Sequence, residues 1–255
     1  MHLGVTDLIE GFFARGKTEK QALSDGKSDN YYFRGNIQDR GPCPALNALA
    51  NQGYLYDYSY PLQVISNDFR PRNGKGLTIP QVEEALMTSL HQDKALASSI
   101  ARPLKQILRP DGTFDLFDMR RHNVIEHDAS LTRLDARQGD NYTFQPAMLQ
   151  AILDDASGGP VTVKTLAKSY NRRKKERKAD GGAALPWNLW FVNIVQTVSF
   201  LNTADTGGKL SHDVMKTFYE EERIPDIILD NRKTRTLTGL LIYAFTLMFY
   251  VALDR

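Results

Sequence analysis

A single cysteine lies between two prolines at the start of an apolar segment, and this arrangement constrains the local fold strongly. Cys43 stands between Pro42 and Pro44. Pro44 suits the first position of a helix, where a missing backbone N–H costs nothing. Leu46 and Leu49 then follow at helical spacing. We therefore predict that Cys43 lies at a helix N-terminus, close to free N–H groups and the positive end of the helix dipole.

This position determines what the thiol of Cys43 could do. Free N–H groups and a helix dipole stabilise a thiolate, so the sequence predicts a lowered pKa for Cys43. A thiolate held in this way could be a nucleophile, a redox sensor or a metal ligand. The alternative is a buried structural cysteine, which is the common fate of a single one. The residue pattern by itself leaves both interpretations open.

The whole chain has the size and pattern of one helical domain. Its 255 residues are enough to bury a sizeable core. Apolar residues recur at helical spacing, and no clear alternating pattern indicates strands, so we predict an all-α, single-domain fold. The formal net charge of +2 gives no indication of a nucleic-acid partner. One cysteine excludes an intramolecular disulfide.

A second cluster of chemically active residues occurs further along the chain. Glu126, His127 and Asp128 are consecutive, and Ser130 follows after one residue. We expect the Asp128 carboxylate to accept a hydrogen bond from the His127 ring, which would fix its tautomer and raise its basicity. Glu126 and Ser130 offer oxygen ligands of the kind that Mg²⁺ or Mn²⁺ takes. A mixed polar cluster is also typical of a solvated turn.

These two motifs together resemble those of the fungal haem-thiolate peroxidases, the family of chloroperoxidase and the unspecific peroxygenases. The first motif is Pro-Cys-Pro-Ala-Leu-Asn-Ala-Leu-Ala-Asn, and the second is Glu-His-Asp-Ala-Ser. The resemblance covers most of residues 35–230. It implies helices around a buried haem b, with Cys43 as the axial ligand of the iron. It also implies that Pro42, Pro44 and Leu46 lie beside the haem.

The same resemblance implies a metal site and a distal face. Glu126, the backbone carbonyl of His127 and Ser130 would bind Mg²⁺ or Mn²⁺ near a haem propionate. The His127 side chain would point to the distal face of the haem. In the family, a helix on that face carries a glutamate that handles the protons of peroxide. The matching position here is Gln196, in an apolar segment that has no acidic residue.

That departure affects the predicted activity. A glutamine amide can form hydrogen bonds but cannot transfer a proton, so His127 with Asp128 would have to act as the base. The resemblance implies a peroxidase or peroxygenase that uses hydrogen peroxide to oxidise or oxygenate a small organic substrate, in fungal secondary metabolism. One alternative is a haem-thiolate enzyme with a non-peroxide reaction, such as a rearrangement, cyclisation or dehydration. Another is a non-catalytic haem-binding protein associated with a membrane.

Two further segments stand out by their charge. Residues 171–178 carry six arginines and lysines, and we predict a solvated loop or helix face there. The segment from Thr236 to Leu253 contains no charge and is just long enough to span a membrane as a helix. It could equally be a buried core helix, and both alternatives stay open.

The resemblance and the apolar tail suggest a domain division. We expect a peroxidase domain over residues 1–230, with an insertion over residues 56–70 relative to the family. The apolar helix would occupy residues 231–255. The N-terminal residues lack the pattern of a signal peptide. We therefore expect an intracellular protein that could associate with a membrane, or a secreted one if a signal peptide has been removed.

Overall fold

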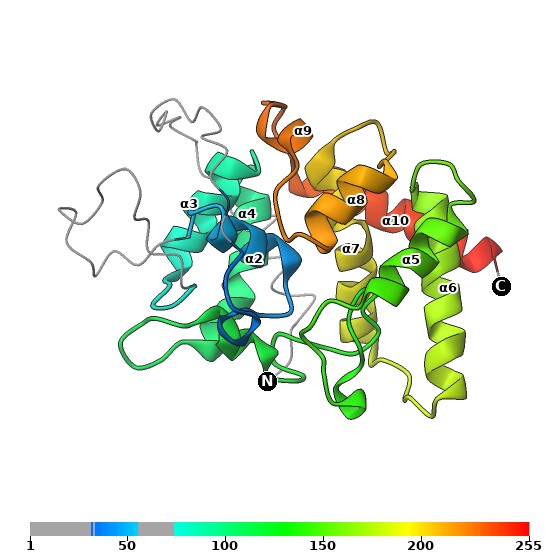
Figure 1. The fold of residues 1–255 in the computed structure, drawn as a ribbon, viewed down its shortest axis with the longest axis horizontal. Coiled ribbons are helices and arrows are strands. Elements are labelled where there is room, and N and C mark those ends of the chain that lie inside the picture. Colours follow the sequence, from blue (N-terminus) through cyan, green and yellow to red (C-terminus); the bar gives the residue numbers. More distant parts are fainter. Residues whose placement is uncertain (1–31, 33, 56–73, 255) are drawn as a thin grey trace.

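The chain is all-helical in the part that the structure describes, a computed structural model covering residues 32, 34–55 and 74–254. That part contains nine α-helices and no β-strand, which confirms the predicted fold class (Figure 1). The predicted insertion over residues 56–70 lies outside the described residues. The helices are α2 (Pro44–Asn51), α3 (Ile79–Ser89), α4 (Lys94–Ala101), α5 (Pro146–Asp155), α6 (Val163–Ala179), α7 (Trp187–Ala204), α8 (His212–Tyr219), α9 (Asp226–Leu229) and α10 (Leu237–Leu253).

Local capping signals explain where several helices begin. Cys43 is the N-cap of α2 and Pro44 is its first residue, as predicted. At α3, the backbone N–H of Thr78 donates to Oε1 of Gln81 at 2.7 Å, which satisfies a donor at the start of the helix. At α8, Oγ of Ser211 accepts a hydrogen bond from a backbone N–H of the first turn at 3.3 Å.

Helix α7 occupies the middle of the molecule. It lies between the α3–α4 pair and the α5–α6 pair (Figure 1). Its side chains Ile194, Val198 and Leu201 are fully buried. Both α6 and α10 pack along α7, and α2 packs against α8. The core of the protein therefore forms around α7. Helix α2 is connected to it through α8, and the Glu126–Ser130 segment contacts α7 directly at Ala129.

The uncharged tail forms α10, which packs onto the rest of the protein. Thr236 caps it by accepting a hydrogen bond from the N–H of Gly239 at 3.0 Å. Leu240, Ala244 and Leu247 are buried, and α10 lies against α6 and α7. Of the two alternatives for this segment, the structure shows the packed helix. Among the described residues, no helix has the length and apolar character needed to cross a membrane.

The basic segment is part of α6 and is only partly solvated. The side chains of Lys174, Lys175 and Lys178 are exposed, but Arg173 and Arg177 are buried. The prediction of a solvated segment is therefore wrong for the two arginines. A guanidinium can be buried when it is paired with a carboxylate. The two buried arginines of α6 form such pairs at the candidate site.

Candidate functional site

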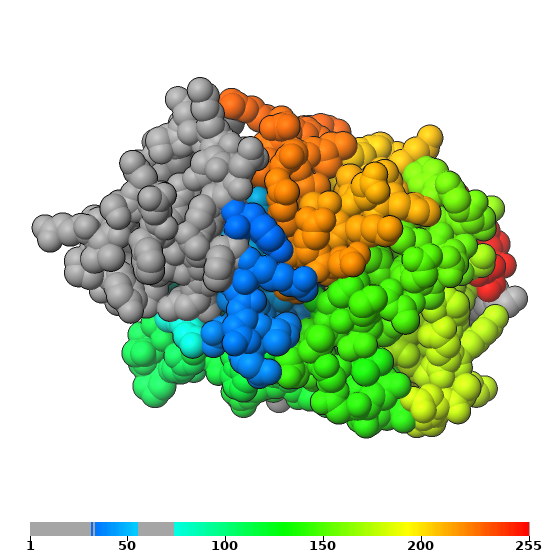
Figure 2. Space-filling view, in the orientation of Figure 1, coloured from blue at the N-terminus to red at the C-terminus, as the bar shows by residue number. Residues whose placement is uncertain are grey.

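The thiol of Cys43 is free and half-buried at the N-terminus of α2. Figure 2 shows the exposed part of residues 34–55, in blue, bordered by green and orange parts of the chain, while most of α2 itself is buried. Burial raises the pKa of the Cys43 thiol and outweighs the backbone N–H groups of Leu46 and Ala45, which act to lower it. The predicted lowering of the pKa is therefore wrong, because the sequence revealed the helix terminus but not the burial.

A buried network fixes α2 to distant parts of the chain. Oε1 of Glu222 accepts hydrogen bonds from Nδ2 of Asn47 at 2.7 Å and from Nη2 of Arg133 at 3.1 Å. The backbone carbonyl of Glu222 accepts another from Nδ2 of Asn51 at 3.0 Å. Glu222 adopts a φ of 51°, which is uncommon for a residue with a side chain. The helix that carries Cys43 is thus held by an ion pair between Glu222 and Arg133, both of which are buried.

The imidazole of His127 is buried and has a defined tautomer. Its Nδ1 lies 2.8 Å from the backbone carbonyl oxygen of Asp128, which can only accept, so Nδ1 carries the proton. The prediction that the Asp128 carboxylate holds this ring is wrong: that carboxylate instead accepts from the N–H of Ala136 at 2.9 Å. Burial lowers the pKa of His127, which favours the neutral ring with a lone pair on Nε2.

Helix α7 meets the His127 loop, and Gln196 lies at this contact. The Gln196 side chain is exposed. It lies close to the imidazole ring, and its proximity acts to raise the pKa of His127. It does not complete a hydrogen bond with Nε2, which is buried without a partner among the described residues. One turn earlier, Nδ2 of Asn193 donates to the carbonyl of Ala129 at 3.1 Å, while its Oδ1 is also unpartnered within the described part. The structure therefore brings His127 and Gln196 together, and their place on the distal face of a haem stays a prediction.

Glu126 lies in a group of potential metal ligands that the sequence analysis found only in part. Its Oε2 accepts hydrogen bonds at 2.7 Å from Nδ1 of His122 and at 2.7 Å from Nδ2 of Asn141. One ligand atom each from His122, Glu126 and Asp128 lie within 4.8 Å of one another. Burial raises the pKa of Glu126. The sequence analysis missed His122 and Asn141, although His122 precedes Glu126 by four residues.

The hydroxyl of Ser130 stabilises the turn that follows it. Its Oγ accepts hydrogen bonds from the backbone N–H groups of Thr132 at 3.2 Å and Arg133 at 3.1 Å. A hydroxyl oxygen has two lone pairs, and these bonds already use that capacity. The metal site predicted from Glu126, the His127 carbonyl and Ser130 stays a prediction.

The loop that carries these residues is anchored to α6 through Asp135. Its Oδ1 accepts from Nη2 of Arg173 at 2.6 Å and from the N–H of Ala129 at 3.0 Å, and its Oδ2 accepts from Nε of Arg177 at 2.7 Å. Arg173 also donates through Nε to the carbonyl of Ser130 at 3.0 Å. Ala129 has a φ of 73°, so these bonds hold the backbone in a conformation that it would rarely adopt unsupported.

Replacement of Asp135 by asparagine is expected to destabilise the protein by about 3 kcal/mol, because two buried arginines would lose their carboxylate. Burial acts to raise the pKa of Asp135, but the Ala129 N–H and the two arginines outweigh it, and the net pKa is lowered. Its stabilisation is therefore present above the unfolded pKa of about 4 and is lost as the pH falls through the folded value. Urea unfolding at neutral and acidic pH measures both effects.

The matched control is Asp180→Asn, since Asp180 is exposed and pairs with Arg137 at the surface. We expect it to change stability by less than about 1 kcal/mol. Equal effects of the two substitutions would show that Asp135 does not anchor the loop.

The residues at Cys43 and His127 fit a haem with a thiolate ligand. Cys43 offers a free thiol, and Pro42 and Pro44 beside it are half-buried. Nε2 of His127, which has no partner among the described residues, is a buried polar atom that a bound group could contact. Leu46 is buried in the core, and its predicted place beside the haem stays a prediction. The two surface pockets described in this structure are lined by none of these residues.

Comparisons with known proteins identify the family of this chain. A family model described as "Peroxidase, family 2" matches residues 29–58 and 62–235. An aromatic peroxygenase from Cyclocybe aegerita is 26% identical over 238 residues, which cover 79% of this chain and 57% of that protein. A chloroperoxidase from Leptoxyphium fumago is 28% identical over 144 residues, covering 52% of this chain and 36% of that protein.

A second aromatic peroxygenase, from Coprinellus radians, is 26% identical over 159 residues, covering 54% of this chain and 55% of that protein. The matches thus span between about a third and somewhat more than half of the relatives' length. The family match covers most of the chain and includes Cys43, His127 and Gln196. The chain belongs to peroxidase family 2, the family of the haem-thiolate peroxidases and peroxygenases.

Proposed function

We propose that this protein uses hydrogen peroxide to oxygenate or oxidise a small organic substrate, with a haem b bound through the thiolate of Cys43. The observation that carries the proposal is the free thiol at the N-cap of α2. The same chain also contains a buried imidazole, that of His127. A thiolate-bound haem supplies the electron density that favours cleavage of the O–O bond. Two relatives described as aromatic peroxygenases and one described as a chloroperoxidase support this assignment.

Residues near Cys43 favour its role as a ligand. The N–H groups of Leu46 and Ala45 and the guanidinium of Arg133 all act to lower the thiol pKa. Binding to a metal ion deprotonates a thiol, and these groups would then stabilise the negative sulfur against the cost of burial. Glu222 pairs with Arg133 and limits its positive charge near the sulfur. The residues around Cys43 thus support a thiolate that stays attached to iron.

On the distal side, His127 is the proton carrier that we propose. Its neutral Nε2 can take a proton from hydrogen peroxide and return it to the departing oxygen, which leaves as water. Gln196 can orient the peroxide through its amide but cannot exchange protons. For oxygen transfer, a substrate C–H and H2O2 give an alcohol and water.

We also propose that Glu126 and the His127 carbonyl hold a Mg²⁺ or Mn²⁺ ion, and that Ser130 joins them by giving up one of the two backbone hydrogen bonds that its Oγ accepts. His122 then acts on the ligand carboxylate through its 2.7 Å hydrogen bond to Glu126. We expect His122→Ala to weaken Mn²⁺ binding about 10- to 100-fold, which is typical for loss of a partner that orients a ligand. Electron paramagnetic resonance of free Mn²⁺ measures this affinity.

His212→Ala is the control for that titration. His212 is half-buried, and its Nε2 lies 2.9 Å from a backbone carbonyl oxygen, that of Gly159. It should leave Mn²⁺ affinity unchanged. Unchanged affinity in His122→Ala as well would show that the ion does not depend on the carboxylate that His122 holds.

The experiment that tests the activity uses hydrogen peroxide labelled with ¹⁸O and a panel of aromatic and aliphatic substrates. Incorporation of ¹⁸O into the product shows oxygen transfer, and oxidised dye without ¹⁸O shows one-electron peroxidase activity. Failure of the haem-loaded protein to do either would overturn the proposal. A role in secondary metabolism and an intracellular location stay predictions.

A further inference from the structure

Helix α10 presents a row of large apolar side chains to solvent. Ile242, Phe245, Phe249 and Leu253 are exposed by 62%, 59%, 61% and 66%. Their spacing of three, four and four residues places them on one face of the helix. At 1.5 Å per residue, the row extends over about 17 Å. We call these four residues the α10 ridge. A continuous exposed apolar row of this kind marks an interaction surface.

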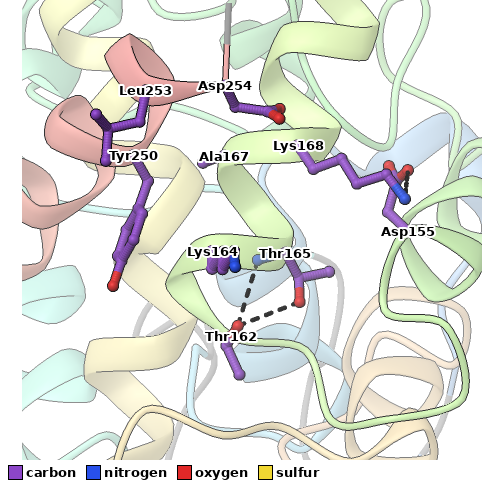
Figure 3. A pocket seen from close by; sticks show the side chains of 9 residues that line it. All are labelled: Asp155, Thr162, Lys164, Thr165, Ala167, Lys168, Tyr250, Leu253 and Asp254. Carbon is purple, nitrogen blue, oxygen red and sulfur yellow. Dashed lines mark hydrogen bonds and ion pairs between the residues drawn. The ribbon is translucent and has the colours of Figure 1, made fainter.

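Lysines of α6 lie beside the end of the α10 ridge. Lys164 and Lys168 line a pocket of about 390 Å³ together with Tyr250 and Leu253 of α10 (Figure 3). Nδ2 of Asn171 donates to two backbone carbonyls at the end of α10, at 3.1 and 3.0 Å, and so fixes this end against α6. The ridge and the lysines are therefore parts of one rigid surface.

Most of the exposed side chains of α6 are lysines. Besides Lys164 and Lys168, the exposed side chains of α6 include Lys174, Lys175 and Lys178. The acidic groups beside them are largely engaged. Asp155 pairs with Lys168 at 3.5 Å and with Arg172 at 2.9 Å, and Glu176 pairs with Arg172 at 2.7 Å. Asp254, which also lines the pocket, is an exposed acid at the end of α10.

We propose that the α10 ridge and the exposed lysines of α6 form a binding surface for a membrane that contains anionic lipids. An apolar helix face bordered by lysines is the pattern that lies in the headgroup region, with the apolar side chains inserted and the charges facing lipid phosphates. The opposite face of α10 is buried in the protein, so the helix would lie along the membrane surface.

The charge favours a lipid surface over a second copy of the chain. A symmetric dimer formed through the ridge would use the same patch on both subunits. Parallel packing of the two ridges would bring the α6 lysines of the two copies toward one another, and like charges at an interface are unfavourable. Antiparallel packing would leave these lysines in solvent, where their charge contributes nothing to the interface. An anionic bilayer neutralises the same lysines. Each lysine near such a surface contributes to binding, and added salt weakens that contribution.

Co-sedimentation with vesicles tests this proposal on the full chain. We expect binding to phosphatidylcholine vesicles that contain phosphatidylserine, and much weaker binding without it. The double substitution Phe245→Ser with Phe249→Ser should lower the affinity roughly tenfold or more, since two large apolar side chains no longer insert. Lys164→Glu should lower it about fivefold or more. The matched controls are Ile227→Ser, an exposed apolar residue of α9, and Lys105→Glu, an exposed lysine distant from α6 in sequence.

The double variant could lose binding because it does not fold. A fluorescence measurement on a different variant tests insertion of the ridge without relying on the double variant. The wild type already contains Trp187 and Trp190, so its emission is the reference. Relative to the wild type, the emission of Phe249→Trp should shift further to the blue with the anionic vesicles and be quenched more by brominated lipids. Absence of binding, or equal binding of the wild type and the double serine variant, would overturn the proposal. So would a dimer in sedimentation velocity that the double substitution abolishes while vesicles are not bound, because the ridge would then serve a second copy.

Discussion

Replacement of Cys43 by alanine is expected to abolish peroxide-dependent oxidation and the spectral signature of a thiolate-bound haem. Cys43 is the only cysteine of the chain, so no other thiol can replace it. The side chain is half-buried and forms no disulfide, and we expect its truncation to cost only about 1 kcal/mol of stability. The measurement is the absorption spectrum of the reduced, carbon-monoxide-bound protein. We expect a strongly red-shifted Soret band in the wild type and its loss in Cys43→Ala.

Ser211→Ala is a suitable control, because it also removes the N-cap side chain of an eight-residue helix. It should keep the red-shifted band at a small cost in stability, about 1 kcal/mol. Retention of the band in Cys43→Ala would show that another residue binds the iron. A wild-type protein with an ordinary histidine-type spectrum would return Cys43 to a structural role.

The second large effect is expected from Gln196→Glu. It adds a carboxylate beside His127, the proton carrier that we propose for the wild type, and where proton transfer by the buried His127 limits turnover the rate should rise by up to about 10²- to 10⁴-fold. The position is exposed and lies close to the His127 ring, so a carboxylate there has room and a neighbour that can share its proton. Single-turnover kinetics of the haem-loaded protein with hydrogen peroxide measures the change directly. The pH profile should also gain the titration of the new carboxyl group.

Gln196→Leu is the matched control, since it keeps a similar volume and removes the amide. It should give no gain. An unchanged rate in Gln196→Glu would show that Nε2 of His127 already performs the proton transfer. A large gain that comes with loss of a separate, non-peroxide reaction would favour the alternative enzyme class considered from the sequence.

The sequence predicted the features that depend on neighbouring residues. The start of α2 at Pro44 and the N-cap position of Cys43 follow from local sterics and hydrogen bonding, and the structure confirms both. The all-α fold class follows from helical spacing of apolar residues. The two motifs also identified the family, because each is a compact run of residues with a defined chemistry.

Features that depend on the folded environment could not be predicted in the same way. The pKa of Cys43 is raised because burial outweighs the helix terminus, and burial depends on how the rest of the chain packs. Nδ1 of His127 donates a hydrogen bond to the backbone carbonyl of Asp128 instead of its carboxylate, because the carboxylate accepts a hydrogen bond from the backbone N–H of Ala136. Likewise, the partners of Arg173 and Arg177 lie about forty residues earlier in the chain.

The hydrogen bonds that hold α2 have a consequence for synthesis of the protein on the ribosome. Asn47 and Asn51 bind Glu222 across 175 and 171 positions of sequence, and Gln52 binds the backbone N–H of Ile224 across 172. The segment that carries Cys43 emerges early but cannot acquire these contacts until residues near 224 have been translated. Closing such long loops is slow because of their entropy. The cysteine helix is therefore locked in place only after residues near 224 have been translated, and the site that we propose for haem is completed at that stage.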